Sequence, residues 1–179
     1  MVIKMDFDKL LYIAKHAITS YFRREEYNPG FYGEKYASFV TLTKQKELRG
    51  CIGSLEAHRD LYLDVADNAI NAAFYDPRFE PLRINETEHL EIEVSVLSKP
   101  SKFEGNDEEW IEFIKKQHPG VIIKKNGFRA TFLPDVWKQL PDPYEFMYHL
   151  SIKAGLRDWR NAEKFFYTTK SESKPWLKI

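Results

Sequence analysis

The sequence predicts an α+β fold in which antiparallel β-sheets pack against helices. Apolar residues recur at helical spacing in several segments, and runs rich in β-branched and aromatic residues come in neighbouring pairs. The dipeptide Asn126-Gly127 joins two such runs, and Asn-Gly is the preferred turn of a two-residue β-hairpin. Hairpins with helices between them favour antiparallel sheets over a parallel doubly wound sheet.

The amino-terminal part of the chain is predicted to form a helix followed by a hairpin. Residues 6–24 carry apolar side chains at helical spacing, behind Asp6 as a candidate N-cap. Residues 36–43 are rich in aromatic and β-branched side chains, and residues 48–55 follow after a short polar segment. These two runs are expected to pair as antiparallel strands.

A second helix, a strand and a third helix follow. Residues 59–75 have an apolar stripe at helical spacing, and Asp76-Pro77 ends the helix because proline disfavours helical backbone in the residue before it. Residues 90–97 (LEIEVSVL) alternate between apolar and polar, which predicts a half-buried strand. Residues 107–117 begin with acidic and end with basic residues, as the helix dipole favours.

The carboxy-terminal part is predicted to contain a hairpin, a helix and a last strand. Residues 121–125 and 128–133 are the β-rich runs on either side of Asn-Gly. Residues 143–154 form a helix that ends at Gly155, a glycine C-cap, and residues 164–169 return as a strand.

The length and composition suit a single folded domain over residues 1–179. Lys99-Pro100-Ser101 marks a place where two unequal lobes would separate. The 27 basic and 27 acidic side chains give zero net charge, so the chain lacks the electrostatic footprint of a dedicated nucleic-acid-coating protein. We therefore do not expect nucleic acid as its partner.

The single cysteine and the charged amino-terminal residues are informative about the cellular compartment of the protein. One cysteine cannot form an intramolecular disulfide, which favours a reducing compartment. Residues 1–18 mix lysines and acids with apolar residues, unlike a signal peptide or a membrane-spanning helix. We expect a cytoplasmic protein without a membrane partner.

The segment LRGCIGSL, residues 48–55, contains that cysteine, Cys51. In a regular strand Arg49, Cys51 and Gly53 would face the same side, with Cα atoms two positions apart roughly 6.5 Å from each other. Arg49 would then favour the thiolate of Cys51, a candidate catalytic nucleophile. Gly50 and Gly53 leave the strand uncovered, as at a ligand-binding cleft. Alternatively, Cys51 is a buried structural residue of the hydrophobic core, and the glycines let a helix pack closely against the strand.

A second candidate site lies in the segment YDPRFEPL. Pro77 and Pro81 stiffen a stretch that displays Asp76 and Arg78, and a rigid loop with mixed charges can bind an anionic or polar small molecule. An internal pair between Arg78 and a carboxylate that holds the loop is the alternative. Both interpretations can apply together.

Familiar signatures of cofactor, metal and catalytic sites are missing. The five histidines include no HExxH pattern, and the sequence has no GxSxG, GxxxxGK[ST] or GxGxxG motif, so we predict no cofactor and no metal. Cys51 and His58 are conceivable as a dyad, which requires adjacency in space. The hairpin KKNGFRATF combines Lys124, Arg129 and Phe128 in a way that could contact nucleic acid, but a solvated hairpin with an inward phenylalanine is commoner.

A series of blocks across the chain resembles the AMMECR family. LRGCIG is the segment that resembles the family signature, and further blocks follow in family order: FVTL before it, then DPRFEPL, LEIEVSVLSKP, HPGVII, TFLPDVW and KAGL. The resemblance implies an α+β fold with two unequal lobes and an intracellular protein. In prokaryotes it implies association with Memo-like and radical SAM proteins. It implies no established reaction, so a small-ligand or modification-pathway protein and a non-enzymatic adaptor or regulatory module both stay open.

Overall fold

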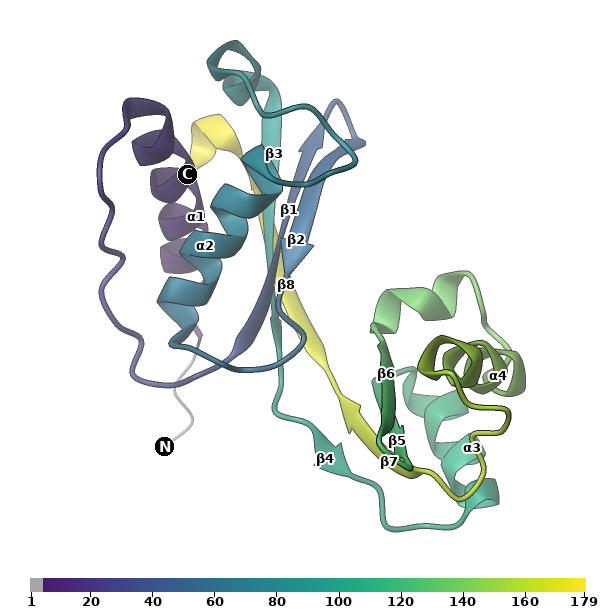
Figure 1. Cartoon of the computed structure of the whole chain (residues 1–179). Coiled ribbons are helices and arrows are strands. Elements are labelled where there is room, and N and C mark those ends of the chain that lie inside the picture. The colour runs from purple at the N-terminus through teal and green to yellow at the C-terminus, as the bar shows by residue number, and fades with distance from the viewer. Residues whose placement is uncertain (1–4) are drawn as a thin grey trace. The chain divides into compact units, whose positions relative to one another are not determined.

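The computed structural model describes residues 5–179, whose contacts divide the chain into two compact units. The first unit contains the described residues up to Leu97 together with Lys170–Ile179, and the second contains Ser98–Thr169. Each unit is built around a four-stranded sheet (Figure 1). The strand pairs are antiparallel, which confirms the predicted α+β class.

Part of the charged amino-terminal stretch, residues 1–4, lies outside the described residues. None of the helices formed by residues 5–179 has the length and hydropathy needed to cross a membrane.

In the first unit, two helices cover one face of a sheet with the order β2-β1-β3-β8 (Figure 1). The order of elements differs from the predicted one mainly in an additional strand at the end of the chain. The elements are α1 (Phe7–Arg23), β1 (Ala37–Lys44), β2 (Glu47–Gly53), α2 (Leu61–Phe74), the 3₁₀ helix η1 (Ile84–His89), β3 (Leu90–Leu97), β8 (Thr169–Pro175) and the 3₁₀ helix η3 (Trp176–Lys178).

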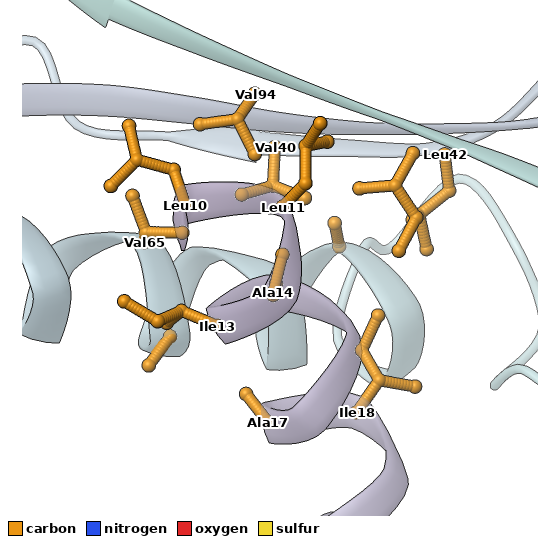
Figure 2. Close-up of a cluster of buried hydrophobic side chains, with 14 of the residues drawn as sticks. Leu10, Leu11, Ile13, Ala14, Ala17, Ile18, Val40, Leu42, Val65 and Val94 are labelled. Carbon is orange, nitrogen blue, oxygen red and sulfur yellow. The ribbon is translucent and has the colours of Figure 1, made fainter. Parts of the chain in front are cut away.

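The core of the first unit lies between the helices and the sheet. Asp6 caps α1 by accepting a hydrogen bond from the backbone N–H of Lys9 at 3.1 Å, as the sequence predicts. Leu11 of α1, Val40 of β1 and Val94 of β3 are fully buried, and Figure 2 shows them meeting at this boundary. The apolar stripe of α1 and the apolar alternation of β3 therefore face each other, as period 3.6 and period 2 require.

Helix α2 approaches β2 closely because residue 50 is glycine. A Cβ atom on Gly50 would lie 2.1 Å from the backbone carbonyl oxygen of Ala72. One on Gly53 would lie 2.2 Å from the ring of Phe39. The space beside each glycine is thus already filled, by a helix backbone in one case and a side chain in the other.

A buried carboxylate ties α2 to the sheet and to the loop after β2. Asp64 is 1% exposed and accepts hydrogen bonds from Ser38 Oγ at 2.6 Å, Ser54 Oγ at 2.7 Å and Arg59 Nε at 2.9 Å. Asn68, one turn further along α2, donates to Asp64 at 3.0 Å. With these partners the buried charge is satisfied, and α2 is held in register with β1.

The second unit has a sheet with the order β4-β7-β5-β6, against which α4 packs (Figure 1). Its elements are β4 (Ser101–Lys102), α3 (Asp107–Gln117), β5 (Gly120–Lys125), β6 (Phe128–Phe132), the 3₁₀ helix η2 (Pro134–Lys138), α4 (Pro143–Ala154) and β7 (Glu163–Tyr167).

Predicted turns and caps of the second unit are confirmed. Asn126 and Gly127 have φ of 52° and 82°, the left-handed backbone that a type I′ hairpin turn needs. Gly155 ends α4 with φ of 77°. The core of the second unit includes Trp110, whose indole N–H donates a hydrogen bond to the sulfur of Met147 at 3.4 Å.

The main element that the sequence analysis did not predict is β8. Most residues of β8 (TKSESKP) are exposed, and the strand lies at the edge of its sheet next to β3. An exposed polar edge strand has no alternation of apolar and polar side chains, so the period-2 signal is missing.

Replacing Gly50 with alanine tests the close approach of α2 and β2. We expect Gly50→Ala to lower the free energy of unfolding by about 1–3 kcal/mol, because the backbone of Ala72 must move. Gly53→Ala on the same strand should cost less, because it displaces the Phe39 side chain through a change of χ1 and leaves the helix backbone in place. Urea unfolding of both variants measures the difference, and equal losses would contradict this account.

Candidate functional site

Strand β2 contains a β-bulge at Arg49. Leu42 pairs with Gly50 while Thr43 pairs with Leu48, so Arg49 is the extra residue on β2. From Gly50 onwards the alternation is regular, with Gly50 towards α2 and Cys51 opposite Thr41 on the other face. The regular alternation predicted for the whole of LRGCIGSL is therefore wrong at Arg49.

The guanidinium of Arg49 binds Glu86 of η1. Its Nε and Nη2 atoms donate to the two carboxylate oxygens, each at 3.1 Å, and Lys44 adds a third donor at 2.9 Å. Arg49 is the main reason that the pKa of Glu86 is lowered to about 2. The backbone N–H of Arg83 and the ammonium group of Lys44 lower this pKa further, and desolvation raises it. The Nη1 atom of Arg49 is buried and has no hydrogen-bond partner among residues 5–179.

Asp76 lies at the centre of the other charged group. It is 3% exposed, and it accepts hydrogen bonds from the backbone N–H of Cys51 at 2.9 Å and from Nε and Nη2 of Arg78 at 3.0 and 2.7 Å. The Arg78 guanidinium holds the pKa of Asp76 well below its usual range, against the opposing effect of desolvation. The loop after α2 is thereby fixed to the middle of β2.

Arg78 is held on one side and exposed on the other. Besides its two bonds to Asp76, its Nη2 donates to the carbonyl oxygen of Cys51 at 3.2 Å, yet 54% of the side chain is exposed. Asp76 raises the pKa of Arg78, and the charge of a Cys51 thiolate is a smaller contribution in the same direction. Arg78, rather than Arg49, is thus the arginine whose side chain contacts Cys51, and the contact is with the backbone carbonyl oxygen.

The thiol of Cys51 is partly buried. Its Sγ atom lies 3.3 Å from Oγ1 of Thr41, the residue opposite on β1. Cys51 is therefore not enclosed in the apolar core between sheet and helices, where Val40 and Leu42 are fully buried. Gly50 has the packing role that the alternative interpretation gave it, since the backbone of Ala72 in α2 lies beside it, whereas Gly53 is covered by the Phe39 side chain of β1 and not by a helix.

Two further residues singled out from the sequence, His58 and Phe128, have exposed side chains. His58 is exposed and lies 3.8 Å from Glu56, and no described contact joins it to Cys51. Phe128 is 52% exposed, so the expectation of an inward phenylalanine in the KKNGFRATF hairpin is wrong. Among residues 5–179, no cluster of three or more His, Cys, Asp or Glu side chains is arranged to hold a metal ion.

Two pockets contain none of the predicted site residues. A pocket of about 380 Å³ in the second unit is lined by polar residues that include Asn106, Asp107 and the buried Lys164. A pocket of about 480 Å³ in the first unit lies beside the β1–β2 turn and η1, with Lys46 and His89 in its wall. Neither is lined by Cys51 or Arg78.

Sequence reasoning missed Glu86 and Thr41. Glu86 lies in the polar stretch INETEH, which gives no sign that it meets an arginine 37 positions earlier. Thr41 could have been found, because a hairpin that pairs residues 36–43 with 48–55 brings some residue of the first strand opposite Cys51.

The profile of the AMMECR1 family matches residues 11–172 of the chain, a range that runs through both units. The protein Mbar_A1807 of Methanosarcina barkeri is 40% identical over 132 residues, which cover 73% of this chain and 65% of the relative. The protein MK0488 of Methanopyrus kandleri is 42% identical over 136 residues, covering 70% and 64%. The matched part of the chain spans just under two thirds of the length of these relatives.

A solved structure has a similar fold. The crystal structure of the uncharacterised protein PH0010 from Pyrococcus horikoshii superimposes with a TM-score of 0.75 at 31% sequence identity. The superposition covers 92% of this chain and 89% of the PH0010 chain.

The lowered pKa of Glu86 predicts how stability depends on acid. Because the pKa falls from 4.5 to about 2 on folding, Glu86 stabilises the fold fully above pH 4.5, and this contribution is lost as the pH falls through about 2. We expect Glu86→Gln to be less stable than the wild type at neutral pH and to differ from it less at about pH 2.

Urea unfolding at several pH values measures this difference. The matched control is Glu88→Gln, which changes an exposed carboxylate of the same 3₁₀ helix. If Glu86→Gln and Glu88→Gln lose the same stability at every pH, the contact with Arg49 does not carry the effect.

Proposed function

The chain belongs to the AMMECR1 family, and on that premise we propose that it binds a small anionic molecule beside Cys51, with Arg78 as the anion-binding group. Nε and Nη2 of Arg78 already donate to Asp76 and Cys51, so a carboxylate or phosphate would bind at the Nη1 end of the guanidinium. The protein would then bind a small ligand or act in a modification pathway, and the thiol of Cys51 would be the group available for covalent chemistry.

The observation that carries this proposal is the placement of one exposed arginine by one buried carboxylate. Asp76 binds both the backbone N–H of Cys51 and the Nε edge of Arg78, so the guanidinium is held against the backbone of Cys51. Since 54% of the Arg78 side chain is exposed, an anion can approach it from solvent. A preorganised cation loses little entropy when it binds.

Arg49 has a different role in this proposal from the one its sequence position suggested. Two of its nitrogens already bind Glu86, so Arg49 shapes the strand next to Cys51 rather than tuning the thiol directly. Its buried Nη1 has no acceptor among residues 5–179, and an unsatisfied buried donor costs roughly 1–3 kcal/mol. A polar atom of a ligand that reached Nη1 would remove that cost.

The extent, location and partners of the protein are part of the proposal. The family match crosses both compact units, which supports residues 1–179 acting as one AMMECR-like domain. We infer a cytoplasmic protein whose physiological partners include Memo-like and radical SAM proteins, because the family resemblance implies them.

The alternative is a non-enzymatic adaptor or regulatory module that binds a protein or nucleic acid. The exposed Phe128 favours it, since an exposed aromatic ring on a hairpin that also carries basic residues is a suitable contact for a base or a partner side chain. Nucleic-acid binding through this hairpin would weaken steeply with salt and on Arg129→Ala.

Alkylation of Cys51 by a charged and a neutral reagent tests the anion site. Cys51 is the only cysteine, so modification reports on this position alone. We expect the ratio of the iodoacetate rate to the iodoacetamide rate to fall about fivefold in Arg78→Gln, as the loss of about 1 kcal/mol of charge attraction gives. Arg78→Lys, which keeps the charge, should retain most of the ratio.

Lys46→Gln is the matched control, because it removes one positive charge from the turn of the same hairpin. Inorganic phosphate should slow both reagents in the wild type and have less effect in Arg78→Gln. An unchanged ratio in Arg78→Gln would contradict the anion site, and a thiol that reacts only after unfolding would contradict the whole proposal.

A further inference from the structure

The exposed side of α4 carries an apolar stripe. Tyr144, Tyr148 and Ile152 follow one another at four-residue intervals and are 54%, 53% and 54% exposed. The opposite side of the helix is anchored in the core of the second unit, where Phe146 and Leu150 are fully buried. A helix that packs on the core with one side usually has polar residues on the other side. The exposed apolar stripe of α4 is therefore a candidate surface for binding another protein surface.

The stripe continues beyond the end of α4. Phe128, at the start of β6, is 52% exposed, and its ring lies 3.5 Å from where a Cβ atom of Gly155 would be. Gly155 follows the last residue of α4. The apolar surface therefore runs the length of the helix and ends on the β5–β6 hairpin.

Charges along the flank of the stripe are arranged in a self-complementary order. Glu145 lies in the first turn of α4 and Lys153 in the last, with His149 midway between them and 3.7 Å from Glu145. Residues four and eight positions apart lie on the same side of a helix, so this flank runs from negative to positive.

An antiparallel copy of the same helix would match this order. A two-fold axis near His149 brings Glu145 of each helix opposite Lys153 of the other and lays the two apolar stripes together. Lys153 already donates one hydrogen bond, to the carbonyl oxygen of Thr131 at 3.0 Å, and its Nζ lies 5.2 Å from the centre of the Phe132 ring. An ammonium group has three donors, so these contacts leave Lys153 able to bind a carboxylate as well.

We propose that α4 is the interface of a homodimer in which two copies of this chain pair their α4 helices antiparallel. The two-fold contact is isologous, with the same surface on both copies. Because the interface is centred on a single helix, it is of the small class that gives weak and reversible association. This inference does not depend on the proposed anion site, which lies in the first unit.

Sedimentation equilibrium over a wide range of protein concentration tests the proposal. The wild type should show a monomer–dimer equilibrium. Tyr148→Asp and Ile152→Asp should each weaken it at least about tenfold, because an aspartate would be buried in an apolar contact. Both positions are exposed in the monomer, so the variants should still fold, as circular dichroism can verify.

A charge exchange distinguishes this arrangement from any other dimer. Glu145→Lys alone should weaken association, and the double variant Glu145→Lys with Lys153→Glu should restore it, since the exchanged charges meet again across the two-fold axis. Glu112→Lys on the exposed side of α3 is the matched control and should change nothing. A wild type that stays monomeric, or a dimer that tolerates Tyr148→Asp, would overturn the proposal, as would a double variant as weak as the single one.

Discussion

The close approach of α2 to β2 at Gly50 is the constraint on which the first unit depends. Only a residue without a side chain lets the carbonyl of Ala72 come so near the strand that an added Cβ would lie 2.1 Å away. The end of α2 is thereby held over β2, and Asp76, two residues beyond the helix, can bond to the backbone of Cys51. A larger residue at position 50 would displace the helix and, with it, the carboxylate that organises the candidate site.

Arg49 and Arg78 are each bound by a carboxylate next to strand β2, but their side chains differ in exposure to solvent. The Arg49 side chain is only 14% exposed and is bound on two of its nitrogens by Glu86, in an arrangement that leaves one buried donor unpaired. Arg78 is bound equally well by Asp76 but remains largely in solvent. Burial thus distinguishes the guanidinium of Arg49, which supports the strand, from that of Arg78, which solvent reaches.

Much of the fold could be predicted because its signals are local. The predicted helix over residues 6–24 is observed as Phe7–Arg23 between Asp6 and Arg24 as caps, and the strand over residues 90–97 is observed with these bounds. Strand β8 could not be found in this way, because a polar edge strand is defined by its hydrogen bonds to β3 and not by its side chains. The partner of Arg49 could not be found either, since Glu86 is 37 positions away.

The sequence by itself determined the fold class, the turns at Asn126-Gly127 and Gly155, and the presence of one cysteine between two glycines and close to Arg49. These follow from periodicity, backbone preference and composition, which each residue carries wherever it lies. Only the tertiary structure decided that a bulge turns Arg49 to Glu86, that Gly50 admits a helix, and that Arg78 is the cation near Cys51. The reason is physical: burial and pairing between distant segments fix a charge's environment, and no local pattern encodes which segments will meet.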